Sequence, residues 1–178
     1  PDDGAWYVNF YNGLVDSPNK SNNYFYVRCV RGGQQSTSFI NSSNGTVTDN
    51  KTGLVWQQGE PGYMPWGSAL SYCNGLSLGG STDWRLPNVK ELESLTDDTR
   101  YYPAVDTTFF PNAYASVYWS STTFAGYPGD AWSVSFGYGH VGSSAKGYGG
   151  GYVRCVRGGQ SGLFDYYCDD DNDGYIDS

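Results

Sequence analysis

The chain contains a long internal repeat, and this repeat constrains its fold more than any other feature. The segment YVRCVRGGQ stands at residues 26–34 and recurs unchanged at residues 152–160, an offset of 126 positions (152 − 26 = 126). At the same offset AWYVNF (5–10) aligns with AWSVSF (131–136). The recurring single residues are Gly13, Val15, Ser17 and Lys20, which return as Gly139, Val141, Ser143 and Lys146. Nine consecutive identities at one offset are no accident of composition, so we expect the same local structure in both copies.

The repeat divides the chain into three parts. Residues 1–34 are the last part of one repeat, residues 35–160 are a complete repeat, and residues 161–178 form an acidic tail. The partial repeat has two interpretations. It is the end of a preceding repeat in a tandem array, or its strands pair with a neighbouring molecule, because an unpaired apolar strand edge needs a covering surface.

The repeated segment has the pattern of a β-hairpin. Trp132, Val134 and Phe136 alternate with polar residues, and alternation with a period of two is typical of strands. We expect the Gly- and Ser-rich residues 137–151 to form a long loop before the next strand, and the same hairpin to recur at residues 5–31.

Two short helices are predicted inside the complete repeat. The first would place a set of apolar residues on one face and end at Gly75 or beyond; the set is Trp66, Ala69, Leu70, Cys73 and Leu76. The second would start after Pro87, with Asn88 as its cap, Glu91 three residues later, and Val89, Leu92 and Leu95 pointing inward. The predicted class is therefore α+β, mostly β, with two short helices and long-loop hairpins after a partial-repeat hairpin.

Charge excludes two classes of partner. Charged residues make up 16 % of the chain and the net charge is −8, whereas nucleic acids and anionic membranes bind basic surfaces. No apolar stretch approaches the length of a membrane helix, so membrane insertion is not expected either.

The four cysteines predict disulfides and an oxidising, extracellular location. Cys29, Cys73, Cys155 and Cys168 contain no CxxC pair, which argues against a zinc site. An even number of cysteines in a Gly- and Tyr-rich chain favours disulfides, and four buried free thiols are the alternative.

Six motifs in a fixed order carry a resemblance to a known family. They are TDNKTGLVWQ (48–57), WGSALSYCNGL (66–76), DWRLPNVKELESL (83–95), VYWSST (117–122), AWSVSF (131–136) and YVRCVRGG (152–159). Together they resemble the Lcl C-terminal domain family, over roughly residues 47–159. The resemblance implies a C-type-lectin-like or formylglycine-generating-enzyme-like fold, a Cys73–Cys155 disulfide, and a place on bacterial surfaces, often in tandem. Cys29 and Cys168 would then pair within one molecule or link two protomers.

The tail contains a calcium motif. In DDDNDGYID (169–177) carboxylates stand at loop positions 1, 3, 5 and 9, and a glycine at position 6 permits the sharp turn that gathers oxygen ligands. The candidate Ca²⁺ ligands are Asp169, Asp171, Asp173, Tyr175 and Asp177. The motif resembles a thrombospondin type 3 calcium repeat more than an EF-hand, and a solvated acidic tail is the alternative.

The sequence contains candidate sites for attached glycans and candidate contacts for glycan ligands. Asn19, Asn41, Asn44 and Asn50 begin N-x-[ST] sequons, although such sequences are also common in ordinary loops. Surface aromatics stack on sugars, and Tyr138 and Tyr148, which lie in the expected loop, are the candidate ligand contacts. We expect Trp84, Trp119 and Trp132 to belong to the core instead.

Catalysis has little support. His140 has no counterpart in the first copy, where Leu14 stands, and no evident carboxylate partner. Asp83, Glu91 and Glu93 fit a turn residue and charges on a helix better than a catalytic pair. We therefore expect a secreted, non-enzymatic structural subunit of a surface filament or adhesive tandem array, which assembles with itself head to tail through the hairpin and the tail. The alternatives are a carbohydrate-binding, lectin-like adhesin and a relic of an enzyme fold.

Overall fold

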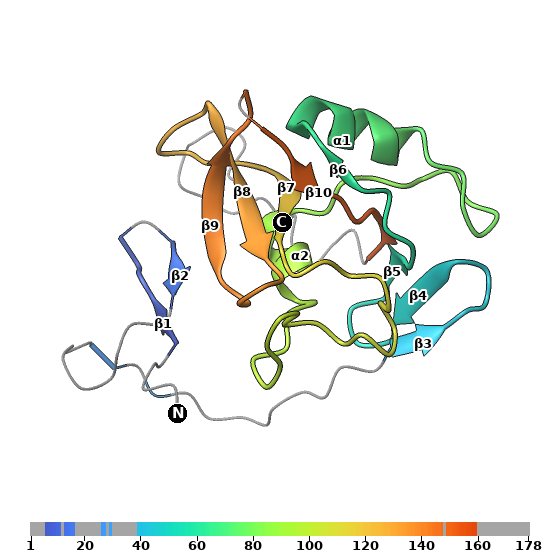
Figure 1. The fold of residues 1–178 in the computed structure, drawn as a ribbon, viewed down its shortest axis with the longest axis horizontal. Coiled ribbons are helices and arrows are strands. Elements are labelled where there is room, and N and C mark those ends of the chain that lie inside the picture. Colours follow the sequence, from blue (N-terminus) through green and yellow to red (C-terminus); the bar gives the residue numbers. More distant parts are fainter. Residues whose placement is uncertain are drawn as a thin grey trace, which may run out of the picture.

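The computed structural model describes residues 6–11, 13–16, 26–27, 29, 39–147 and 149–159. These residues form two β-sheets and two short helices, which confirms the predicted α+β, mostly β class (Figure 1). Within the described residues, neither helix is long and apolar enough to cross a membrane.

The larger sheet has seven strands in the order β1-β2-β9-β8-β7-β10-β6. Their bounds are β1 Tyr7–Val8, β2 Val15–Asp16, β6 Tyr63–Met64, β7 Val117–Thr123, β8 Asp130–Ser135, β9 Val141–Ala145 and β10 Gly151–Tyr152. Neighbours are antiparallel except β10 and β7, which run parallel. The two strands of the partial repeat thus extend the sheet of the complete repeat (Figure 1).

The smaller sheet has four antiparallel strands in the order β11-β5-β4-β3. Their bounds are β3 Phe39–Asn41, β4 Thr46–Asp49, β5 Leu54–Gln57 and β11 Val156–Gly158. The repeated segment YVRCVRGG therefore crosses between the sheets, because it supplies Tyr152 to β10 and Val156 to β11.

Both predicted helices are present. Helix α1 (Trp66–Asn74) follows Pro65 and ends at the cap Gly75, with Ala69 and Cys73 buried. Helix α2 (Val89–Glu93) has the predicted cap, since the Asn88 side chain accepts from the Glu91 N–H and the Glu91 carboxylate accepts from the Asn88 N–H. Leu92 and Leu95 are buried, as expected, whereas Val89 is partly buried.

The core consists of two clusters of buried residues, and the neighbouring β7 residues Tyr118 and Trp119 belong to different clusters. Trp84 and Trp119 are buried and confirm their predicted place in the core, while Trp132 is partly buried against it. A disulfide joins Cys73 on α1 to Cys155, which lies just before β11. The pairing implied by the family resemblance is therefore present.

The prediction of a long loop over residues 137–151 is wrong. Val141–Ala145 forms strand β9, which pairs with β8 from Asp130↔Ala145 to Val134↔Val141. Gly and Ser have low intrinsic strand preference, but the edge of β8 supplies partners for their backbone groups, and pairing outweighs that preference. Between β8 and β9 the connection is a tight turn, with Gly139 at φ 80° and its N–H donating to the Ser135 carbonyl.

Candidate functional site

The contact between the partial repeat and the complete repeat is the most distinctive site of the molecule. Strand β2 pairs antiparallel with β9 through Val15↔Val141, so the hairpin of the partial repeat lies along the sheet edge of the complete repeat (Figure 1). Val15 also packs against the core of the complete repeat.

The two hairpins have the same internal register. Val8↔Val15 in the first copy corresponds to Val134↔Val141 in the second. The turns also match: the Asn9 N–H donates to the Leu14 carbonyl at 2.9 Å, and the Ser135 N–H donates to the His140 carbonyl at 2.9 Å. The repeated sequence therefore builds the same local structure twice, as predicted, although this hairpin is shorter than the predicted long-loop hairpins at residues 5–31 and 131–156.

Two tryptophans at equivalent positions make the contact reciprocal. A β-carbon on Gly13 would lie 3.3 Å from Cη2 of Trp132, and one on Gly139 would lie 3.5 Å from Cζ2 of Trp6. Each indole ring thus lies against the turn glycine of the other copy. Both glycines have positive φ (74° and 80°), so glycine meets two requirements at once: the left-handed turn and the space for the ring.

The first copy exposes side chains that the second copy buries. Val8 is 53 % exposed, whereas its equivalent Val134 is 0 % exposed. Val27 is 82 % exposed, whereas Val153 is 0 % exposed. In the complete repeat, β8 pairs with β7, but among the described strands β1, its equivalent, is the last one of the sheet. The partial repeat therefore presents apolar side chains and a strand edge that the rest of a repeat would cover.

A second candidate site is an exposed cluster of tyrosines. The rings of Tyr101, Tyr102 and Tyr138 lie with centroids 5.7–6.0 Å apart, and the His140 ring stacks on Tyr138 at 5.7 Å. The three tyrosines are 71 %, 59 % and 48 % exposed. The structure thus places the predicted Tyr138 among aromatics that the sequence analysis missed, because residues 101–102 and 138 meet only through the fold. Tyr148 lies outside the described residues.

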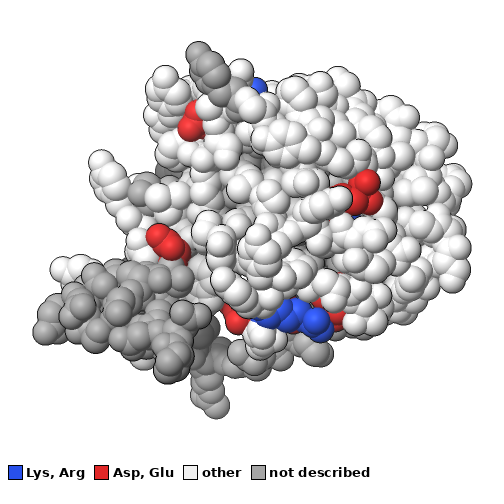
Figure 2. Space-filling view, in the orientation of Figure 1, with Lys and Arg blue, Asp and Glu red and all other residues white. Residues whose placement is uncertain are grey.

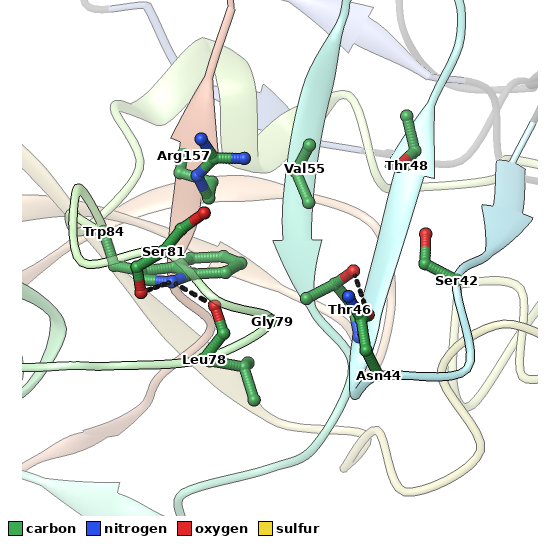
Figure 3. Close-up of a pocket in the computed structure, with 10 residues that line it drawn as sticks. All are labelled: Ser42, Asn44, Thr46, Thr48, Val55, Leu78, Gly79, Ser81, Trp84 and Arg157. Carbon is green, nitrogen blue, oxygen red and sulfur yellow. Dashed lines mark hydrogen bonds between the residues drawn. The ribbon is translucent and has the colours of Figure 1, made fainter.

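A shallow polar hollow of about 180 Å³ lies beside the smaller sheet (Figure 3). Its lining residues are Ser42, Asn44, Thr46, Thr48, Val55, Leu78, Gly79, Ser81, Trp84 and Arg157. Much of its hydrogen-bonding capacity is used internally: Thr46 donates its hydroxyl to Asn44 Oδ1 at 2.7 Å, and the Trp84 indole donates to the Leu78 and Ser81 carbonyls. The Arg157 guanidinium pairs with Asp83 at 2.7 Å, and this hydrogen bond lowers the pKa of the Asp83 carboxyl.

Arg154 and Glu60 form a buried ion pair next to Tyr118 of β7. Arg154 is fully buried, donates to the Gln57 and Gln58 carbonyls, and pairs with Glu60 at 3.1 Å. Glu60 also accepts a hydrogen bond from the Tyr118 hydroxyl. Burial raises the pKa of Glu60 despite the opposing charge of Arg154, and burial together with the Glu60 charge raises the pKa of Tyr118. Since the polar groups face one another inside the core, we interpret this cluster as structural.

The predicted metal and modification sites fall largely on surface or undescribed residues. All five candidate calcium ligands, Asp169, Asp171, Asp173, Tyr175 and Asp177, lie outside the described residues, as do Cys168 and Asn19. Cys29 is exposed with a free thiol, and its predicted pairing stays a prediction. Asn41, Asn44 and Asn50 are exposed. Among the residues that the structure describes, no group of three His, Cys, Asp or Glu side chains could hold a metal ion.

The carboxylates considered for catalysis have partners of their own. Glu91 forms a two-pronged pair with Arg85 at 2.7 Å, and Glu93 pairs with Lys90 at 2.8 Å. With Asp83 paired to Arg157, none of the three forms a pair of facing carboxylates. The face of the molecule in Figure 2 is largely uncharged, with acidic and basic side chains in small separate groups.

The family model described as the Lcl C-terminal domain matches residues 45–157. No curated protein shows significant similarity to the chain.

Proposed function

Because the chain belongs to the Lcl C-terminal domain family, which suggests an extracellular, surface-associated domain, we propose that it is a structural subunit of a bacterial surface filament or adhesive tandem array. In this role the N-terminal hairpin and the acidic C-terminal tail join successive subunits head to tail. The chain then acts through assembly and adhesion and has no catalytic activity.

The observation that carries this proposal is the exposure of the partial repeat. Val8 and Val27 are exposed, although the same positions in the complete repeat, Val134 and Val153, are fully buried in the core. A sequence that has kept core residues at these positions needs a surface that covers them. The remainder of another repeat has the matching chemistry, because β7 covers the equivalent strand edge in the complete copy.

The joint is heterologous, because it brings together two different surfaces of the chain. A contact of this kind propagates into a filament unless its rotation closes a ring. A Ca²⁺ ion bound to the candidate motif in the tail would neutralise the clustered carboxylates of that motif at the joint. A Cys29–Cys168 disulfide would make the joint covalent.

Negative-stain microscopy of the full chain tests this proposal. We expect filaments at high protein concentration, weakened by a calcium chelator and by reductant. Val8→Lys places a charge on the exposed face of β1 and should abolish assembly. Ile40→Lys is the matched control, because Ile40 is 51 % exposed on β3, a comparable exposure on another sheet. Monomers at every concentration, with calcium present, would refute the proposal.

The second candidate function is carbohydrate binding by a lectin-like surface, which the exposed cluster of Tyr101, Tyr102 and Tyr138 favours. Aromatic rings of this kind stack on the apolar faces of sugars. Glycan-array binding that Tyr101→Ala and Tyr138→Ala abolish would support this function, whereas binding that survives both substitutions, or no binding at all, would remove it. Tyr127→Ala is the matched control, since Tyr127 is 66 % exposed away from the cluster.

A further inference from the structure

Strands β2 and β9 occupy equivalent positions in the two copies of the repeat. Val15 and Val141 are separated by 126 positions, which is the repeat offset, and they pair with each other in an antiparallel ladder. When two equivalent residues lie opposite each other in antiparallel strands, a local two-fold axis passes between them. The contact is therefore isologous in form, with the same surface on each side.

The backbone of β9 is oriented to make this contact. The Ser135 N–H donates to the His140 carbonyl, so Val134 and Val141 are a non-hydrogen-bonded pair of the β8–β9 ladder. The N–H and C=O of Val141 consequently point away from β8, toward β2. The Asn9 N–H likewise donates to the Leu14 carbonyl, so Val8 and Val15 are a non-hydrogen-bonded pair of the β1–β2 ladder. The N–H and C=O of Val15 therefore point toward β9.

The side chains obey the same symmetry. Trp132 lies against Gly13, and its equivalent Trp6 lies against Gly139. The strand itself, Val141–Ala145, contains only Val, Gly, Ser and Ala. It carries no charge and no proline, the usual means by which an exposed edge avoids pairing with another edge.

We propose that β9 is a self-recognition edge, at which β9 of one complete repeat pairs with β9 of a second copy across a two-fold axis. Val141 then lies opposite Val141 of the second copy, each Trp132 covers the Gly139 of the other copy, and the larger sheets merge into one. The N-terminal hairpin, which carries the same residues, occupies this edge within the chain. The inference goes beyond the proposed head-to-tail joint, because it gives the complete repeat a second, two-fold contact with another copy of the repeat.

The dimer contact is small and therefore weak. Among the described residues, β2 and β9 share one directly opposed residue pair and two indole–glycine contacts, a smaller contact than a standard protein interface. Two isolated copies should associate only at high concentration. Repeats joined in an array would pair far more strongly, because linkage raises their effective concentration.

Val15→Pro in the full chain is the central experiment. The substitution removes the N–H that β2 directs toward β9 and changes no residue of the complete repeat. We expect it to release the hairpin, and sedimentation at roughly 0.1–1 mM protein should show the mass shift from one copy to two. Adding Val141→Pro, which removes the β9 N–H that faces outward and that β8 does not use, should return the protein to one copy.

Two controls separate pairing from unfolding and from aggregation. Near-UV circular dichroism and an intact Cys73–Cys155 disulfide would show that the complete repeat is folded. If Val15→Pro disturbs it, Gly13→Val carries the same test, because its new side chain meets Trp132. Val141→Pro alone also releases the hairpin, but it should stay a monomer, since its edge lacks the N–H.

Three outcomes would overturn the inference. The Val15→Pro and Gly13→Val variants could both remain monomers, or they could form only disordered aggregates. Alternatively, their dimers could persist after Val141→Pro is added. These results are independent of the filament test. Filament formation by the natural chain with a monomeric Val15→Pro variant would retain the proposed function and remove the two-fold contact. A dimeric Val15→Pro variant, with no filaments of the natural chain, would retain the two-fold contact and remove the proposed filament function.

Discussion

Trp6 and Trp132 occupy equivalent positions in the two copies of the repeat, and each lies against the turn glycine of the other copy. One sequence pattern therefore serves both sides of a single contact. The contact needs glycine at both turns, because each turn has positive φ and each must leave room for an indole ring.

Gly13→Ala should loosen the hairpin by two effects. Alanine at φ 74° costs roughly 1–2 kcal/mol in the left-handed region, and its β-carbon would lie 3.3 Å from Trp132. Gly53→Ala is the matched control, since Gly53 has φ 73° with no atom near the new β-carbon. Hydrogen exchange should show faster exchange of the β2 amides in Gly13→Ala, while Gly53→Ala should affect only its own turn. Equal protection of β2 in both variants would contradict the importance of the indole contact.

Glu60→Ala should be strongly destabilising. It leaves the fully buried Arg154 guanidinium without its carboxylate, and breaking a buried pair costs about 3–5 kcal/mol. Asp83→Ala removes an ion pair in which the Asp83 side chain is 60 % exposed, so it should change the free energy of unfolding far less than Glu60→Ala does. Denaturant unfolding of the two variants measures both values, and similar costs would show that the buried pair has no special role.

The buried carboxyl of Glu60 should also influence how stability varies with pH. Burial raises the pKa of Glu60 above 4.5 in the folded protein, so folding favours the protonated carboxyl. The resulting contribution to the free energy of unfolding is fully present below the unfolded pKa and is lost as pH rises through the folded pKa. In Glu60→Gln this dependence disappears. The stability of the natural chain relative to Glu60→Gln should therefore fall as pH increases from about 4.5. A constant or rising difference in denaturant unfolding would show that Arg154 outweighs the cost of burial.

Loss of the disulfide should destabilise the complete repeat. Cys73 and Cys155 are 82 residues apart, and closing a loop of that length stabilises by about 4 kcal/mol in the chain-entropy model. Cys73→Ala with Cys155→Ala should lower the free energy of unfolding by that amount. Cys29→Ser should change it by less than about 0.5 kcal/mol, because Cys29 is exposed. An effect of Cys29→Ser as large as that of the double variant would be unexpected.

The tail should bind Ca²⁺ through its clustered carboxylates. Isothermal titration calorimetry of the full chain should detect binding that Asp171→Asn with Asp173→Asn weakens by at least about tenfold, since both substitutions remove charged ligands. Asp2→Asn with Asp3→Asn changes the net charge equally, outside the motif, and should leave binding intact. Equal binding by both double variants would reduce the tail to a general acidic segment.

The local features of the fold were predictable because their signals are close in sequence. The cap of α2 depends on Asn88 and Glu91, three residues apart, and the matching segments AWYVNF (5–10) and AWSVSF (131–136) predicted the same local structure in both copies. The family motifs predicted the Cys73–Cys155 pairing, which the structure contains. Strand β9 was missed, since Val141–Ala145 has few strand-forming residues and owes its conformation to pairing with β8.

The sequence by itself determined that one local structure occurs twice in the chain, because the repeat sets the same residues within about ten positions of one another in both copies. Only the tertiary structure decided where the first hairpin lies and what Arg154 does. Nothing local brings Val15 to Val141 or Arg154 to Glu60, because these pairs meet only when strands distant in sequence share a sheet edge or a core. The same valine and cysteine are therefore exposed in the partial repeat, as Val27 and Cys29, and buried in the complete repeat, as Val153 and Cys155, since burial depends on the neighbours that the rest of a repeat provides.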